Sequence, residues 1–147
     1  MASKTILQLK GFEELLEQIQ KAGGSVNSAM EKCTKQAANI MHDELKTQMK
    51  AAGVSDSLIE RLPPPVVEQY GNLYVGRVGY EKGGPPDPQN LSDGYKAIFL
   101  NYGTPRRQKH GKIAARGFLE KARNKARPKI KKQQKETLDN ILGELKK

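Results

Sequence analysis

The stretch Tyr95-Lys-Ala-Ile-Phe-Leu-Asn-Tyr-Gly-Thr104, followed after a basic loop by Ala115-Arg-Gly-Phe-Leu-Glu-Lys-Ala122, decides the fold. An apolar run ends at a Gly-Thr turn, and an apolar Phe-Leu pair then opens a new helix. Nothing in this stretch resembles a nucleophile, a metal-ligand set or a phosphate-binding loop. The pattern is typical of an element that determines shape and carries a cationic loop, and it favours assembly over catalysis.

Six residues of this stretch are expected to form the element that sets the fold close to an interface: Phe99, Tyr102, Gly103, Thr104, Phe118 and Leu119. The alternative is ordinary core packing with a turn glycine, which is the simpler interpretation for Phe99. A valine at position 103 should disturb the turn if the φ of Gly103 is positive. The run from Tyr95 to Tyr102 fits a third strand or a short buried helix, and we expect a helical start that continues as a strand.

The chain of 147 residues is expected to form a single domain, residues 1–147. A domain of this size buries about 68–70% of its unfolded surface, so its core needs no disulfides. Cys33 is the only cysteine, which excludes an intramolecular disulfide. No stretch of 18 apolar residues is present, and we expect no membrane partner.

The positive charge is concentrated at one end of the sequence. The net charge is +10, yet residues 106–147 carry 15 Lys or Arg against 4 Asp or Glu, a net +11 (15 − 4). Charge placed in this way indicates a polyanionic partner or an acidic protein surface. The competing interpretation, a solvated helix face that keeps the protein soluble, carries about the same weight. The residues expected to contact DNA or an acidic partner are Arg106, Arg107, Lys109, Lys112, Arg116, Lys121, Lys125, Lys132 and Lys135.

The N-terminal half is predicted to form two helices and a hairpin. Apolar residues at helical spacing predict a helix over 7–22 and a longer one that starts after an N-cap at Ser25 and stops at Gly53. Ser55 can cap a short helical turn, and Pro63-Pro64-Pro65 then favours an extended spacer. Residues 66–80 around Gly71-Asn72 predict a β-hairpin of uncertain register.

A long final helix is predicted from about Ala115 to Leu145, and the loop at residues 106–114 carries no structural signal. Pro128 should kink or break this helix near Arg127, because proline removes one backbone donor. The fold class is therefore α+β: two N-terminal helices, a small antiparallel sheet of about three strands between long helices, and a kinked C-terminal helix.

Catalytic, metal and cofactor sites are not expected. The chain has one cysteine and two histidines, His42 and His110, and no cluster with metal-ligand spacing. Cys33 lies on the apolar stripe of the second helix, where a buried, unreactive thiol is the natural interpretation. No nucleophile elbow or phosphate loop is present. Phosphate contact needs only charge and reach, so non-specific, salt-sensitive DNA binding remains the serious chemical alternative.

The order of elements, together with Phe99-Leu-Asn-Tyr-Gly-Thr104 and Ala115-Arg-Gly-Phe-Leu-Glu-Lys-Ala122, resembles the minor tail or tail-completion family of long-tailed phages and prophages, also called head–tail joining proteins. The opening Gly11-Phe-Glu-Glu-Leu15 is similar as well. The chain departs from the family at Asn101, where an acid is usual, and at Gly117, where proline is usual. The segment from Leu62 to Pro65 stands where the family often has Thr-Gly-x-Leu.

The resemblance implies a non-enzymatic virion protein without cofactors, assembled in the host cytoplasm and located in the neck or tail. Its subunits would form a homo-oligomeric ring, commonly a hexamer, through which double-stranded DNA passes. Other neck and tail proteins would be its partners. Ring formation would cover strand edges that a single chain leaves open. A non-specific DNA-binding protein that acts through its basic C-terminal segment remains the alternative.

Overall fold

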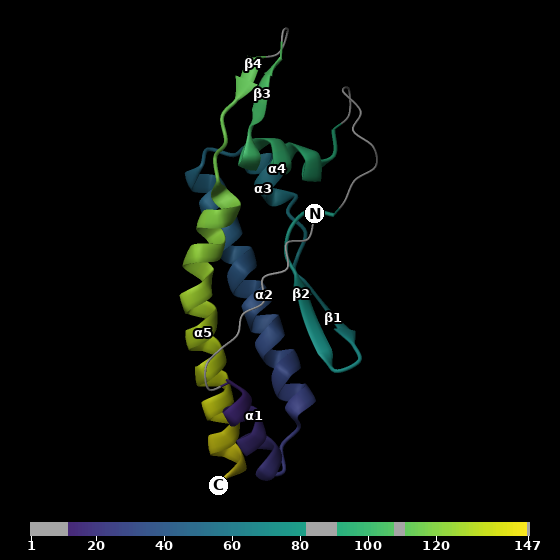
Figure 1. Cartoon of the computed structure of the whole chain (residues 1–147), viewed down its shortest axis with the longest axis vertical. Helices are drawn as coiled ribbons and strands as arrows, with labels where there is room; N and C mark the ends of the chain where they lie inside the picture. Colours follow the sequence, from purple (N-terminus) through teal and green to yellow (C-terminus); the bar gives the residue numbers. More distant parts are fainter. Residues whose placement is uncertain (1–11, 82–90, 108–110, 147) are drawn as a thin grey trace.

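The structure, a computed structural model, describes residues 12–81, 91–107 and 111–146. The chain is α+β, and its two long helices, α2 (Val26–Ala51) and α5 (Phe118–Leu145), run antiparallel along the long axis (Figure 1). The short helix α1 (Phe12–Lys21) packs against one end of this pair. The helices α3 (Asp56–Glu60) and α4 (Asp93–Tyr102) lie near the other end.

The strands of the described residues form two separate hairpins. β1 (Val66–Tyr70) pairs antiparallel with β2 (Leu73–Arg77), and β3 (Thr104–Arg107) pairs antiparallel with β4 (Gly111–Ile113) through an irregular register. The prediction of one sheet of about three strands is therefore wrong. The expected arrangement between long helices is also absent, because the β1–β2 hairpin packs against α2 alone of the two long helices.

Two expectations for the middle of the chain need correction. The predicted change from helix to strand within the run from Tyr95 to Tyr102 is wrong, because this run is helical throughout and the strand starts only after Gly103. Residues 106–114, expected to be a loop without a structural signal, contain the last two residues of β3 and all of β4. These residues show no apolar alternation, so the pattern gives no strand signal although the backbone pairs.

Local signals predicted the ends of several elements correctly. The Ser25 hydroxyl accepts a hydrogen bond from the N–H of Ser28 at 3.2 Å and caps α2. Ser55 caps α3 in the same way through the N–H of Leu58, at 3.4 Å. Gly71 has a positive φ of 59° in the predicted hairpin turn. These signals depend only on neighbours in the sequence, which explains their success.

The core divides into two apolar clusters at the two ends of the α2–α5 pair. One contains Leu45, Met49, Val54, Leu58, Leu62, Phe118 and Ala122. The other contains Ile19, Ala29, Cys33, Leu138 and Leu142. Burial raises the pKa of the Cys33 thiol, in agreement with the expectation of an unreactive side chain.

Polar contacts join α2 to α5 between the two clusters. The Thr137 hydroxyl donates to Oε1 of Gln36 at 2.6 Å, and the ammonium group of Lys129 pairs with the buried Glu44 carboxylate. Each contact forms only at one axial position of the two helices. They therefore oppose sliding of α5 along α2.

α5 continues without a break through Pro128, so the predicted break is wrong and the kink stays a prediction. Pro128 and Asn124 are both exposed. The carbonyl of Asn124, which loses its intrahelical donor to proline, can therefore bond to water. A proline in this position therefore destabilises the helix less than a proline that faces the core would.

A junction between the end of α4 and the start of α5 explains why the quoted stretch decides the fold. The N–H groups of Arg116 and Gly117 donate to the carbonyls of Leu100 and Asn101, each at 3.0 Å. The buried Asn101 side chain accepts from the N–H of Leu119, also at 3.0 Å. Gly117 has no side chain, so Asn101 supplies the cap that the first turn of α5 needs.

The six residues predicted to set the fold differ in their burial at this junction. Phe118 is buried and Leu119 is half-buried against the first cluster, while Phe99 is half-buried beside the ring of Tyr95. Tyr102 is 52% exposed, so it is no core residue. Thr104 starts β3. Gly103 has a φ of 76°. This angle is positive, so a side chain at position 103 is expected to disturb the turn.

Candidate polyanion-binding face

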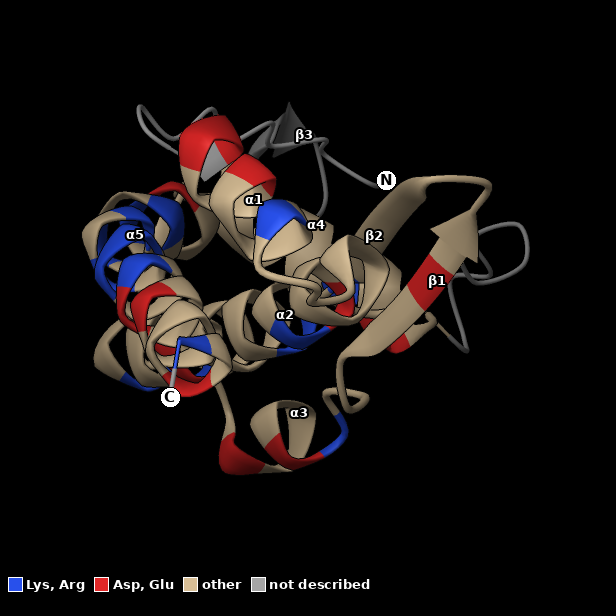
Figure 2. Cartoon of the chain, turned by 90° about the horizontal axis from the view of Figure 1, so that it is seen from below, with Lys and Arg blue, Asp and Glu red and all other residues tan. Residues whose placement is uncertain are grey.

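Four predicted contact residues form a row along α5: Lys121, Lys125, Lys132 and Lys135. Their steps of four, seven and three residues keep them on one side of an α-helix. All four are exposed. From the first to the last, 14 residues at 1.5 Å each span about 21 Å. Figure 2 shows Lys and Arg gathered on α5, on the other side of α2 from the β1–β2 hairpin.

This lysine row has no acidic partners among the described residues. The one ion pair of α5 in that part of the chain joins Lys129 to Glu44 of α2. From Phe118 to Lys135, α5 carries eight Lys or Arg and one acid, Glu120. Desolvating a row of unpaired ammonium groups against a polyanion releases counterions and gives salt-dependent affinity.

The charge pattern of α5 works against the helix itself. Five pairs of basic residues stand four positions apart: 121 and 125, 123 and 127, 125 and 129, 127 and 131, and 131 and 135. Each such like-charge pair destabilises a helix by roughly 0.2–0.5 kcal/mol. A helix selected only for stability would alternate its charges. The repulsion that α5 retains favours a role for the row in binding.

Two further exposed residues, Arg127 and Lys131, widen the charged face beyond the predicted set. They stand four positions apart on a side of α5 next to the lysine row. The sequence signal was present, because both belong to the same basic run. The expectation had included only four lysines of α5, and the exposed charged surface of α5 is broader than that.

Arg116 makes a structural contact that the four lysines of the row do not make. Its Nη1 donates to the carbonyl of Ala52 at 3.3 Å, at the C-terminal end of α2. A cation in this position is favoured by the helix dipole and satisfies a terminal carbonyl. Arg116 and Lys121 line a shallow cleft of about 260 Å³ with Gln48, Ala51 and Ala52. The carbonyl end of α2 makes this cleft less attractive to anions than the row is.

The remaining predicted contacts lie in or near the second hairpin. Arg106 and Arg107 belong to β3 and Lys112 to β4, whereas Lys109 lies outside the described residues. This hairpin stands at the end of the molecule where α5 begins (Figure 1). The predicted contact residues therefore extend from that end along the outside of α5.

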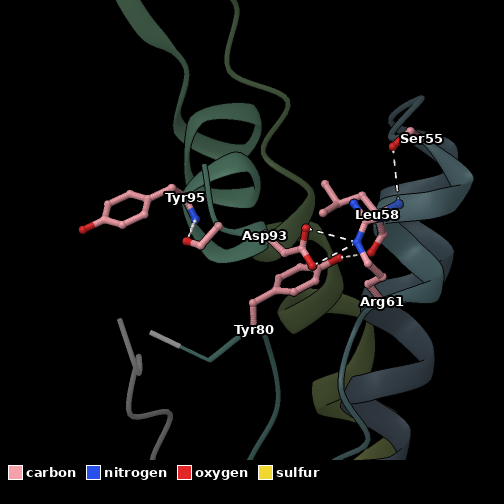
Figure 3. A network of polar contacts seen from close by, with 7 residues as sticks. Ser55, Leu58, Arg61, Tyr80, Asp93 and Tyr95 are labelled. Atoms are coloured by element: carbon pink, nitrogen blue, oxygen red, sulfur yellow. Dashed lines mark hydrogen bonds and ion pairs between the residues drawn. The ribbon is translucent and has the colours of Figure 1, made fainter. Parts of the chain in front are cut away.

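A second polar network lies between α3, the segment after β2, and α4 (Figure 3). The Tyr80 hydroxyl donates to the carbonyl of Leu58 at 2.6 Å, and Nε of Arg61 donates to both carboxylate oxygens of Asp93 at 3.0 and 3.2 Å. Burial raises the pKa of Tyr80 to about 12, and the Asp93 carboxylate adds to the increase. A tyrosine of this kind stays neutral and joins the segment after β2 to α3, while the Arg61–Asp93 pair joins the end of α3 to α4.

The substitution Tyr80→Phe tests this role. Loss of the hydrogen bond should lower the free energy of unfolding by about 0.5–1.5 kcal/mol at neutral pH. Tyr80 ionises near pH 10 in the unfolded chain and near 12 in the fold, so its stabilising contribution is lost as pH rises between these values. The difference between wild type and variant in urea unfolding should therefore shrink above pH 10. A constant difference would contradict the assignment.

The described part of the chain shows neither a metal-ligand cluster nor a membrane-spanning helix. No group of three or more His, Cys, Asp or Glu residues there is arranged to hold a metal ion. None of the helices described has the length and apolar character needed to cross a bilayer.

Comparisons with protein-family models, with curated proteins and with solved structures give no match to this chain.

Proposed function

We propose that this chain is a non-enzymatic structural subunit of a phage neck or tail, which forms a ring that DNA passes through during assembly and ejection. The observation that carries the proposal is the lysine row on α5, whose ammonium groups lack acidic partners among the described residues. A row about 21 Å long suits an extended anionic surface better than a small ligand. The resemblance in the 99–104 and 115–122 segments supplies the phage context.

Two features give further support. The α4–α5 junction provides a physical reason for those two segments to occur together, because Asn101 joins them. An acid, which the family usually has at that position, would accept the same hydrogen bond from the first turn of α5. In addition, the β1–β2 hairpin leaves one face open, as expected of a subunit that is completed by its neighbours.

The test is the particle that the purified chain forms. We expect ring-shaped particles in negative-stain electron microscopy and matching masses in light scattering, with hexamers as the first expectation. The measurement is repeated with neck and tail proteins from the same gene neighbourhood. A monomer at every concentration, with and without those proteins, would contradict the proposal.

The second candidate is a non-specific double-stranded-DNA-binding protein that acts without assembly. The same lysine row favours it, since phosphate contact requires no recognition motif. It differs from the first candidate in one measurable respect. A monomer that shifts duplex DNA at low salt would favour this candidate over the ring.

A further inference from the structure

A buried polar side chain without a hydrogen bond lines the shallow cleft between the C-terminal end of α2 and the start of α5. Gln48 is only 6% exposed, and its side-chain amide has no hydrogen-bond partner among the described residues. A buried amide without a partner lowers stability, because it gives up its hydrogen bonds to water. The amide is not fully enclosed, however, and Gln48 borders the cleft. A molecule that enters the cleft can therefore supply the missing partner.

Two cationic side chains share the cleft with this amide. The Arg116 guanidinium has several N–H donors and uses one for the Ala52 carbonyl, so the others lack a partner within the described ranges. Lys121 is exposed and makes no ion pair there. The small side chains of Ala51 and Ala52 leave a space of about 260 Å³, equivalent to roughly eight water molecules at about 30 Å³ each. The cleft thus combines positive charge, free donors and room for a small polyatomic anion.

The carbonyl groups at the end of α2 oppose an anion less than unpaired carbonyls would, because they already accept hydrogen bonds. The carbonyl of Gln48 accepts from the N–H of Ala52 at 2.9 Å, and that of Lys50 accepts from the N–H of Gly53 at 3.1 Å. The Ala52 carbonyl accepts from Arg116. In addition, α5 begins just after Arg116, and the positive end of its dipole favours an anion. The lysine row remains the stronger attractor, and the cleft adds hydrogen bonds at one defined point.

We propose that this cleft binds one phosphate group, and we call it the phosphate cleft. The Arg116 guanidinium can donate parallel hydrogen bonds to phosphate oxygens, the Lys121 ammonium adds charge, and the Gln48 amide donates through its NH₂ group. Lys121 also belongs to the lysine row, so a duplex that lies along the row passes the mouth of the cleft. The inference rests on the proposed DNA contact and adds a fixed anchoring point to it.

The first test is the substitution Gln48→Met, which removes the amide but keeps the net charge and nearly the length of the side chain. Methionine suits a buried position, so melting should stay close to wild type. A hydrogen bond to a charged group contributes enough that duplex affinity should fall about tenfold. The salt slope should not change, since glutamine carries no charge. Gln18→Met, at an exposed glutamine of α1, is the matched control and should bind as wild type does. Wild-type affinity in the Gln48 variant would overturn the inference.

The second test observes the cleft directly by NMR of the ¹⁵N-labelled chain. The NH₂ signal of Gln48 is identified by its loss in the Gln48→Met spectrum. Three probes are added at equal ionic strength: a short duplex of random sequence, inorganic phosphate and acetate. We expect the duplex and inorganic phosphate to shift the Gln48 signal and the Nε–H signal of Arg116, and acetate to leave both in place.

The outcomes separate the source of the phosphate and the two proposals. Shifts with inorganic phosphate alone would support the phosphate cleft and refute the duplex as its source, whereas equal shifts with acetate would overturn the assignment to phosphate. Duplex binding that leaves the Gln48 signal unchanged would overturn the inference, as would a chain that binds neither duplex nor phosphate. The proposed function would survive both results if rings form, and it would fail on a chain that never assembles whatever the cleft binds.

Discussion

The substitution Gly103→Val should lower the free energy of unfolding by about 3 kcal/mol or more. Gly103 has a φ of 76° and a ψ of 176°, a backbone region that essentially only glycine adopts. A Cβ there would lie 2.7 Å from the carbonyl oxygen of Ile113 and 2.8 Å from the backbone nitrogen of Ala115. Backbone atoms cannot rotate away as a side chain can. The strand pair and the α4–α5 junction must therefore separate.

Alanine variants measure how much the contact and the unusual backbone region at position 103 cost beyond an ordinary left-handed residue. In Gly103→Ala the added Cβ meets the same backbone atoms. Gly117 has a positive φ of 60°, but a Cβ there would have no atom within 4 Å. The Gly117 variant should lose only about 1–2 kcal/mol, the cost of a left-handed residue. Gly143→Ala, in the open interior of α5, should gain about 0.5–1 kcal/mol. Urea unfolding midpoints measure all three, and equal losses at 103 and 117 would show that the contact is unimportant.

The sequence predicted what depends on neighbouring residues. The capped starts of α2 and α3 and the turn of the first hairpin follow from spacing and side-chain chemistry within a few positions. The α+β class and the long final helix were predictable for the same reason. Of the kink or break predicted at Pro128 only the break is wrong, because the effect of proline depends on whether the freed carbonyl faces water.

Contacts between distant segments were not predictable. Asn101 looks like an unremarkable polar residue, and only the fold places its side chain at the first turn of α5. Glu44 and Gln48 are buried although charge and polarity suggest exposure, since α5 covers them. The β3–β4 pairing depends on backbone geometry after Gly103 and leaves no alternation in its residue types.

The placement of the candidate site residues was predictable only where they share one helix. The spacing of Lys121, Lys125, Lys132 and Lys135 was sufficient to place them together on a helix. Arg116 was expected to contact the same partner, and the structure shows that its guanidinium bonds to the end of α2. Sequence spacing cannot reveal such a competing partner, because Ala52 is 64 positions away.

Removal of the lysine row should weaken duplex DNA binding strongly. The variant carries Lys→Gln at positions 121, 125, 132 and 135. Each phosphate contact contributes about 0.9 to the log–log slope of affinity against salt, so four lost contacts should reduce the slope by about 3–4. Fluorescence anisotropy with a duplex of random sequence, measured over a salt series, gives both the affinity and the slope.

A matched control carries Lys→Gln at four exposed lysines elsewhere: Lys32, Lys35, Lys50 and Lys96. Its net charge changes by the same amount, so general attraction to DNA falls equally in both variants. We expect the control to keep most of the slope, because phosphate contact depends on charges within about a Debye length, roughly 10 Å at 0.1 M salt. Equal slopes in the two variants would show that total charge, and not the row, determines binding.

Stability separates lost binding from lost folding. Replacing the row removes three like-charge pairs four positions apart (121–125, 125–129 and 131–135) and two opposite-charge pairs (132–136 and 135–139), so the variant should melt close to the wild-type temperature at low salt. Reduced binding in a variant of unchanged melting temperature then reports contact alone. If the wild-type chain leaves duplex DNA unshifted at low salt, DNA contact is refuted. The row then either meets an acidic protein surface or serves only as a solvated face, and the same two variants would separate these alternatives against neck and tail proteins.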